Sequence, residues 1–204
     1  MSSDDGQIRE FWRSRAATQP TRWTPRALLS YEVAYLQAAA AAPGAILDLG
    51  SGAGELSRAL CTPVTKLDAV DFTEAYRKYF VKPDQVFHLS SVLSFEPTRQ
   101  YDLVLLFGVC TYLSEDEELR MLKRLPSFLN PGGVAVVKNQ CSTGETINYS
   151  GWSEDLNAEY ISRYPSVEGQ EARLRANFKS VRTLTYPSRF QRWPDTEHVG
   201  FVCG

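Results

Sequence analysis

The chain has 204 residues, of which 43% are hydrophobic, and a formal net charge of -2 at pH 7. This length and apolar content predict one domain over residues 1–204, because a second core would be cramped. A net charge this close to zero disfavours a protein that binds nucleic acid or an anionic membrane over most of its surface. We therefore expect neither nucleic acid nor a membrane as a partner.

The cysteines and the N-terminus bear on the cellular compartment. The four cysteines lie far apart and form no CxxC pair, so we expect free thiols and no metal site. The first residues are polar and acidic, unlike a signal peptide, and no apolar run approaches the roughly 18 residues that cross a membrane. These features predict a reduced, cytoplasmic location.

Predicted helices and strands alternate along the chain. Residues 25–42 begin with a proline, carry apolar residues at helical spacing and are followed by Pro43-Gly44, which predicts a helix. An apolar run, a glycine turn and a further helix occupy residues 45–60. Beyond them the pattern predicts strands at 66–72, 85–91, 101–109, 133–139, 180–187 and 198–203, and helices at 73–80, 115–129 and 168–178. Such alternation predicts an α/β fold with a parallel sheet covered on both faces.

The run AILDLGSGAGELSRAL, residues 45–60, places three glycines after an aspartate. A dinucleotide site requires the spacing G-x-G-x-x-G. Here the third position is Glu55, whose carboxylate would meet a pyrophosphate at the helix N-terminus. The spacing therefore disfavours a nicotinamide oxidoreductase.

The alternative spacing, Asp48-x-Gly50-x-Gly52-x-Gly54, resembles motif I of the class I S-adenosylmethionine-dependent methyltransferases. The segments SSVLSF, YDLVLLFGVCTYL and FLNPGGVAVV follow the third, fourth and fifth strands of that family in order. The resemblance covers about residues 25–140. It implies a Rossmann-like, doubly wound sheet of seven strands, mostly parallel with an antiparallel closing strand, and S-adenosylmethionine as the cofactor with S-adenosylhomocysteine as its product.

The resemblance also implies cofactor contacts. Asp48 lies near the amino-acid end of the cofactor, and Asp71, roughly 20 residues beyond the turn, accepts the ribose hydroxyls. Phe72 packs on the adenine. A serine pair replaces the acid that often holds the adenine amino group, so either Ser91 or the backbone around Val92 takes that role. The implied cofactor site comprises Asp48, Gly50, Ser51, Gly52, Gly54, Asp71, Phe72, Ser91, Val92, Phe107, Gly108 and Trp23.

In this family the segments before the first strand and after the fifth close over the methyl acceptor. Both are basic here, over residues 7–31 and 163–192, which favours an anionic small molecule held by arginine forks. The alternative is ordinary solvated surface charge. Trp12 and Trp23 either cover the positively charged sulfur of the cofactor or anchor an N-terminal arm on the core.

Methyl transfer from a sulfonium is an in-line displacement that depends on alignment, and a base is needed only if the acceptor must lose a proton. His198 would orient or deprotonate the acceptor, or is a hydrogen-bonded edge histidine. Lys138 interrupts an apolar strand and would neutralise an anion, or is a strand-end lysine that reaches solvent. Tyr112 follows the fourth strand of the family and is the third catalytic candidate. His88 is expected to be a satisfied strand residue.

The sequence thus predicts methyl transfer to O or N of a small polar, anionic metabolite or sugar-type intermediate. Two alternatives remain open: an RNA or protein acceptor, and a catalytically silent cofactor-binding partner protein. The oligomeric state is also left open. Within the single domain we expect an N-terminal cap and first helix at 1–42, a cofactor-binding core at 43–140 and an acceptor-side closing segment at 141–204.

Overall fold

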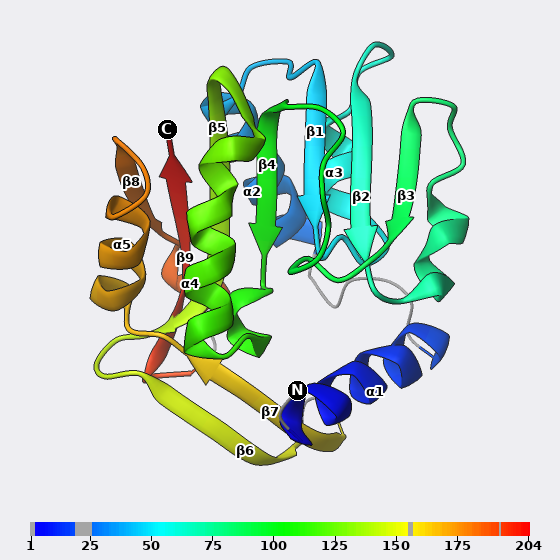
Figure 1. Cartoon of the computed structure of the whole chain (residues 1–204). Coiled ribbons are helices and arrows are strands. Elements are labelled where there is room, and N and C mark those ends of the chain that lie inside the picture. Colours follow the sequence, from blue (N-terminus) through cyan, green and yellow to red (C-terminus); the bar gives the residue numbers. More distant parts are fainter. Residues whose placement is uncertain (1–2, 19–25, 155–156, 192) are drawn as a thin grey trace.

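The structure is a computed structural model that describes residues 3–18, 26–154, 157–191 and 193–204. Its centre is a seven-stranded sheet in the order β3-β2-β1-β4-β5-β9-β8 (Figure 1). The strands β1 to β5 are parallel, and β9 runs antiparallel to both of its neighbours. The bounds are β1 (Ala45–Leu49), β2 (Lys66–Asp71), β3 (Gln85–Leu89), β4 (Tyr101–Phe107), β5 (Leu129–Ser142), β8 (Val181–Thr185) and β9 (Thr196–Cys203). The predicted Rossmann-like fold with an antiparallel closing strand is confirmed.

Helices cover both faces of the sheet, because successive side chains of a buried strand point to opposite faces. Ile46 and Leu103 pack in a core with residues of α2 (Arg26–Ala39) and α3 (Glu55–Leu60). Leu47 and Val104 pack in a second core with residues of α4 (Glu115–Arg124) and α5 (Val167–Arg175). The parallel strands therefore sit between two apolar layers, and their carboxyl ends meet at one edge.

Two predicted helices differ from the structure. The segment 73–80 forms only a 3-10 helix, η1 (Glu74–Tyr79). The segment 115–129 is α4 followed by the 3-10 helix η3 (Leu125–Phe128). Pro126 cannot donate the backbone hydrogen bond that would continue α4. Two further short 3-10 helices are η2 (Cys110–Tyr112), after β4, and η4 (Ser188–Phe190), after β8.

Two elements that the sequence did not predict lie at the carboxyl edge of the sheet. They are helix α1 (Ser3–Thr18) and an antiparallel hairpin of β6 (Ile147–Ser153) and β7 (Ala158–Tyr164), which forms a separate two-stranded sheet. Figure 1 shows both below the ends of the parallel strands, and β7 contacts α1, η2 and β5. We call α1 and this hairpin the roof.

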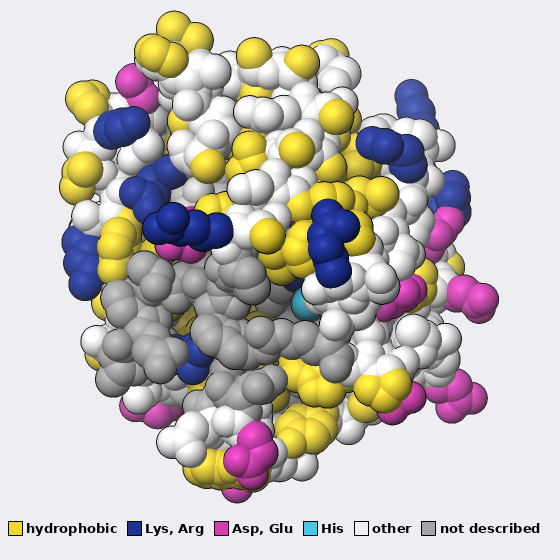
Figure 2. Space-filling view, turned by 180° about the vertical axis from the view of Figure 1, so that it is seen from behind, with side chains coloured by type: hydrophobic (Ala, Val, Ile, Leu, Met, Phe, Trp, Pro, Cys, Tyr) yellow, Lys and Arg dark blue, Asp and Glu magenta, His cyan; other side chains and the backbone are white. Residues whose placement is uncertain are grey.

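Surface features add two observations. Among the described helices none is both long and apolar enough to cross a membrane. On the side turned away in Figure 1, the lysine and arginine side chains that are described lie in several separate places, with acidic side chains among them (Figure 2). The described part of that face therefore carries scattered charge of both signs.

Candidate active site

The loop between β1 and α3 carries the motif glycines. Gly50 N donates to the carbonyl of Val70 at 2.8 Å, which ties this loop to β2. Gly50 has a φ of +75°, and a Cβ there would lie 2.4 Å from Val109 Cγ2. A Cβ at Gly54 would lie 2.5 Å from the Phe80 ring. Packing within the protein thus requires these two glycines, independently of any ligand.

Gly52 and Gly108 differ from them, because the space beside their backbone is open. At Gly52 the nearest atom to an added Cβ is Tyr76 Cζ at 4.0 Å, and at Gly108 nothing lies within 4 Å. Gly108 N donates to the carbonyl of Lys138 at 2.7 Å, so its position is held by β5. A ligand can therefore approach the main chain closely at the ends of β1 and β4, as the predicted cofactor site requires.

Asp71 ends β2 and links it to the glycine loop. Only 8% of the residue is exposed. Its carboxylate accepts hydrogen bonds from Gly52 N at 3.0 Å and from Thr73 N at 2.8 Å. Burial raises the pKa of this carboxyl, and the backbone N–H groups of Gly52 and Thr73 oppose that rise. A carboxylate offers about four lone-pair positions, and the resemblance implies that the ribose hydroxyls bind at this one.

The residues expected around the adenine lie at the ends of β2 and β3. The ring of Phe72 is covered by the guanidinium of Arg9 from α1, with Arg9 Cζ 5.4 Å from the ring centroid. Ser91 Oγ accepts a hydrogen bond from Leu93 N at 3.3 Å, and Val92 is buried in the core beneath α4. Helix α1 therefore reaches the predicted adenine position, and the adenine roles of these residues stay predictions.

An aromatic cluster joins the roof to the segment after β4. The hydroxyl oxygens of Tyr112 and Tyr160 are 2.7 Å apart. Trp12 meets the ring of Tyr112 edge-on at 5.3 Å between centroids, and Phe11 meets Tyr160 at 5.6 Å. Burial raises the pKa of Tyr112 to about 12 and raises that of Tyr160 well above its ordinary value. Both phenols are therefore neutral hydrogen-bonding groups near pH 7.

Lys138 and His198 meet around a residue that the sequence did not single out, Tyr186. Lys138 Nζ lies 5.7 Å from the centroid of the Tyr186 ring, and the His198 ring lies 6.1 Å from it. The Tyr186 hydroxyl donates to Glu32 Oε1 of α2 at 3.2 Å. Gly200 of β9 pairs with Lys138 of β5. A Cβ at Gly200 would lie 3.2 Å from the hydroxyl of Tyr35 on α2. A small residue at this point lets α2 and Tyr186 cover Lys138, which is 7% exposed.

A family model described as a methyltransferase domain matches residues 21–198 of the chain. The chain belongs to this family. The predicted membership of the class I S-adenosylmethionine-dependent methyltransferases is thereby confirmed.

The methyltransferase is similar to several solved structures. One is a complex of DhpI with SAH, with a TM-score of 0.70, 17% identity and 98% and 97% of the two chains covered. Another is the 1,6-didemethyltoxoflavin-N1-methyltransferase of Burkholderia thailandensis, with a TM-score of 0.76, 18% identity and 100% and 90% covered. These likenesses show a shared fold.

Curated sequences also match the methyltransferase. The alpha N-terminal protein methyltransferase 1 of Drosophila melanogaster is 28% identical over 151 residues, which are 68% of this chain and 52% of that protein. The N-terminal Xaa-Pro-Lys N-methyltransferase 1 of Danio rerio is 30% identical over 105 residues, 47% of each protein. The methyltransferase thus spans about half the length of these relatives.

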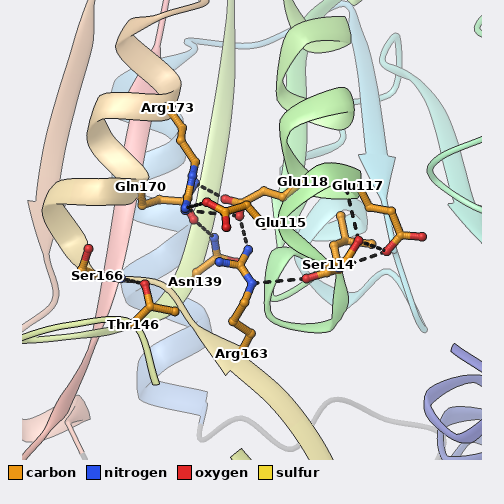
Figure 3. A network of polar contacts seen from close by, with 11 residues as sticks. Ser114, Glu115, Glu117, Glu118, Asn139, Thr146, Arg163, Ser166, Gln170 and Arg173 are labelled. Carbon is orange, nitrogen blue, oxygen red and sulfur yellow. Dashed lines mark hydrogen bonds and ion pairs between the residues drawn. The ribbon is translucent and has the colours of Figure 1, made fainter. Parts of the chain in front are cut away.

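Several predicted residues have other partners in the methyltransferase. Arg163 and Arg173, in the basic segment expected to bind an anion, form ion pairs with the fully buried Glu118 of α4 (Figure 3). His88 is a satisfied strand residue as predicted, because its Nε2 lies 2.7 Å from an oxygen of Asp68. Trp23 lies outside the described residues.

Sequence reasoning missed Tyr160, Tyr186 and Glu32. Glu32 could have been found, because it interrupts the apolar stripe of α2 between Leu28 and Leu36, where a charged residue is unexpected. Tyr160 lies in a segment without a clear period, and Tyr186 lies in the predicted strand 180–187, where nothing in the pattern marked it as functional. Among the residues that the structure describes, no group of three or more His, Cys, Asp or Glu side chains is placed to hold a metal ion.

Proposed function

We propose that this methyltransferase binds S-adenosylmethionine across the carboxyl ends of β1, β2, β3 and β4. It transfers the methyl group to a nitrogen or oxygen of a small polar acceptor that lies between the ends of β4 and β5 and the roof. Figure 1 displays this arrangement, with the strand ends facing α1 and the β6-β7 hairpin.

The donor half rests on three fits between residues and ligand. The open backbone at Gly52 and Gly108 admits a ligand against the main chain. Asp71, buried at the end of β2 beside the glycine loop, supplies a carboxylate acceptor for the ribose hydroxyls. Asp48, 6% exposed at the end of β1, supplies negative charge near a ligand that carries an ammonium and a sulfonium. When bound, S-adenosylmethionine supplies a methyl group activated by its positive sulfur.

The acceptor half rests on the aromatic contacts of the roof, and this observation carries the choice of a small acceptor. Phe11 and Trp12 of α1 pack on Tyr160 and Tyr112, which come from the hairpin and from the segment after β4. These contacts close the edge of the sheet next to the donor site. An acceptor held beneath such a roof is shielded from water and aligned with the methyl carbon.

We assign different roles to the three catalytic candidates. Tyr112 keeps its proton at neutral pH, because burial raises its pKa to about 12, so it orients the acceptor by hydrogen bonding. Lys138, near the end of β5, would contribute positive charge that favours an anionic acceptor. His198 accepts a proton where the acceptor must lose one.

The test is methyl transfer from S-adenosylmethionine labelled in the methyl group, measured on three panels of acceptors. The first panel holds small amines, alcohols, carboxylates and phosphates, the second holds short peptides with a free N-terminal amine, and the third holds RNA. We expect label transfer to members of the first panel, with Tyr112→Phe and Lys138→Ala reducing transfer. Transfer confined to the RNA panel, or no transfer on any panel, would contradict the proposal.

A protein N-terminus is the second candidate acceptor. It is favoured by the similarity to the fly N-terminal protein methyltransferase, which is 28% identical over 68% of this chain. An N-terminal amine is a small nucleophile that an extended peptide could carry beneath the roof. Label transfer to the peptide panel in preference to the small molecules would establish this candidate in place of the first.

A further inference from the structure

A buried ionic network connects the roof to the core of the domain (Figure 3). Glu118 of α4 is fully buried. Its carboxylate receives hydrogen bonds from Arg163 of β7, from Gln170 of α5 at 2.6 Å and from Arg173 of α5 at 3.5 Å. Asn139 of β5 extends the network by donating to Gln170 Oε1 at 2.9 Å. Three elements, α4, β7 and α5, therefore meet at the Glu118 carboxylate, and β5 joins the network through Gln170.

A buried carboxylate is costly unless ion pairs and hydrogen bonds satisfy it. Arg173 and Gln170 already join Glu118 to α5, which packs in the same core as α4. These two contacts with Glu118 are sufficient to hold α4 and α5 together. The contribution of Arg163 is different, because β7 belongs to the two-stranded sheet and not to the main one.

Arg163 also binds the segment that follows β4. Its Nε donates to the carbonyl of Leu113 at 3.3 Å, and its side chain is 13% exposed. Leu113 follows Tyr112, and Arg163 follows Tyr160 by three residues on β7. The guanidinium thus fixes β7 against the same segment whose tyrosine hydroxyl lies 2.7 Å from that of Tyr160.

We infer that Arg163, seated on the buried Glu118, is a positioning residue for the methyl acceptor. It holds the β6-β7 hairpin over the segment after β4 and so sets the distance between Tyr112 and Tyr160, without touching the donor half of the site. This inference rests on the proposed function, because it takes the methyl acceptor to bind beside Tyr112 and Tyr160.

The test compares Arg163→Gln with Arg175→Gln in the full chain. Arg175 is a matched control, because its guanidinium likewise binds one glutamate, Glu171, and one backbone carbonyl, that of Val181 at 3.0 Å. Its side chain is 55% exposed on α5. Three quantities are measured: amide hydrogen exchange by mass spectrometry, S-adenosylhomocysteine binding by calorimetry, and KM and kcat for the acceptor that the panels identify.

For Arg163→Gln we expect exchange of the backbone amides in β6 and β7 to accelerate about tenfold, since a charge-assisted hydrogen bond is lost, while β1 and β4 keep their protection. S-adenosylhomocysteine affinity stays within about twofold of the wild type, and the acceptor KM rises about tenfold with a smaller change in kcat. Arg163→Lys, which keeps the charge but not the fork, recovers part of the KM. Arg175→Gln changes none of these quantities.

Three results would overturn the inference. One is hairpin exchange in Arg163→Gln equal to that of the control. The second is a uniform loss of protection through the main sheet, which indicates a general structural role. The third is a loosened hairpin with an unchanged acceptor KM. Failure of the proposed function is separate, because it appears in the wild type as no binding of S-adenosylhomocysteine, as no methyl transfer on any panel, or as transfer confined to RNA.

Discussion

Replacement of Asp71 by asparagine perturbs the link between β2 and the glycine loop. The carboxylate accepts from Gly52 N at 3.0 Å and from Thr73 N at 2.8 Å. Asparagine keeps one acceptor oxygen and turns an amide NH2 toward the other donor, so one charge-assisted bond becomes neutral and the other is lost. Those losses sum to about 2–4 kcal/mol.

Part of this cost is offset, because burial raises the pKa of Asp71 and the variant no longer buries a charge. We therefore expect the free energy of unfolding to fall by about 2 kcal/mol, which lowers Tm by about 4–8 °C in a domain of this size. The affinity for S-adenosylhomocysteine should fall at least about tenfold, since the ribose hydroxyls lose a charged acceptor.

The assay combines thermal unfolding with calorimetric titration of S-adenosylhomocysteine. Asp84→Asn is the matched control, because Asp84 precedes β3 and is exposed; it should leave both Tm and affinity unchanged. A folded Asp71→Asn protein with wild-type affinity would refute the ribose assignment. Wild-type stability would refute the account of the hydrogen bonds to the loop.

Three further predictions concern other parts of the site. Gly50→Ala should destabilise the fold by more than about 2 kcal/mol, because its Cβ would lie 2.4 Å from Val109. Gly132→Ala is the control, because Gly132 has a φ of +80° but open space around it, so that this variant has only the backbone strain. Urea unfolding of both variants measures the difference in stability. The pKa of Tyr112 is about 12 in the folded protein, against an ordinary value of 10.0 in the unfolded chain. Its contribution to stability is therefore complete below pH 10.0 and is lost as the pH rises through about 12. The stability of Tyr112→Phe should therefore fall less steeply than that of the wild type over this alkaline range, and parallel curves would contradict the raised pKa. Lys138→Ala should bind S-adenosylhomocysteine normally and lose acceptor turnover, whereas a loss of cofactor affinity would place Lys138 in the donor half.

The core of the fold was predictable because its strands are short apolar runs with turn residues behind them. Strand β1 and the loop of Gly50, Gly52 and Gly54 could be located from a short stretch of sequence, and the match to the family model supports that prediction. The structure adds a second reason for two of these glycines, which is packing within the protein. Gly50 and Gly54 are explained by contacts with Val109 and Phe80, and Gly52 is the motif glycine left open to a ligand.

The roof could not be predicted, because its elements lack a strong period. Most positions of β6 are exposed, most of those in β7 are only partly buried, and α1 is polar along much of its length. The pairing of Arg163 and Arg173 with Glu118 depends on contacts between segments about 50 residues apart. A sequence shows that such arginines are basic, whereas their partners follow only from the tertiary structure.

The account depends most directly on the identity of the cofactor. The decisive measurement is a calorimetric titration of the purified protein with S-adenosylmethionine, S-adenosylhomocysteine and NADH. We predict micromolar binding of the first two, weakened by Asp71→Asn, and no binding of NADH. Binding of NADH alone would contradict the assignment of the glycine loop and with it the proposed function.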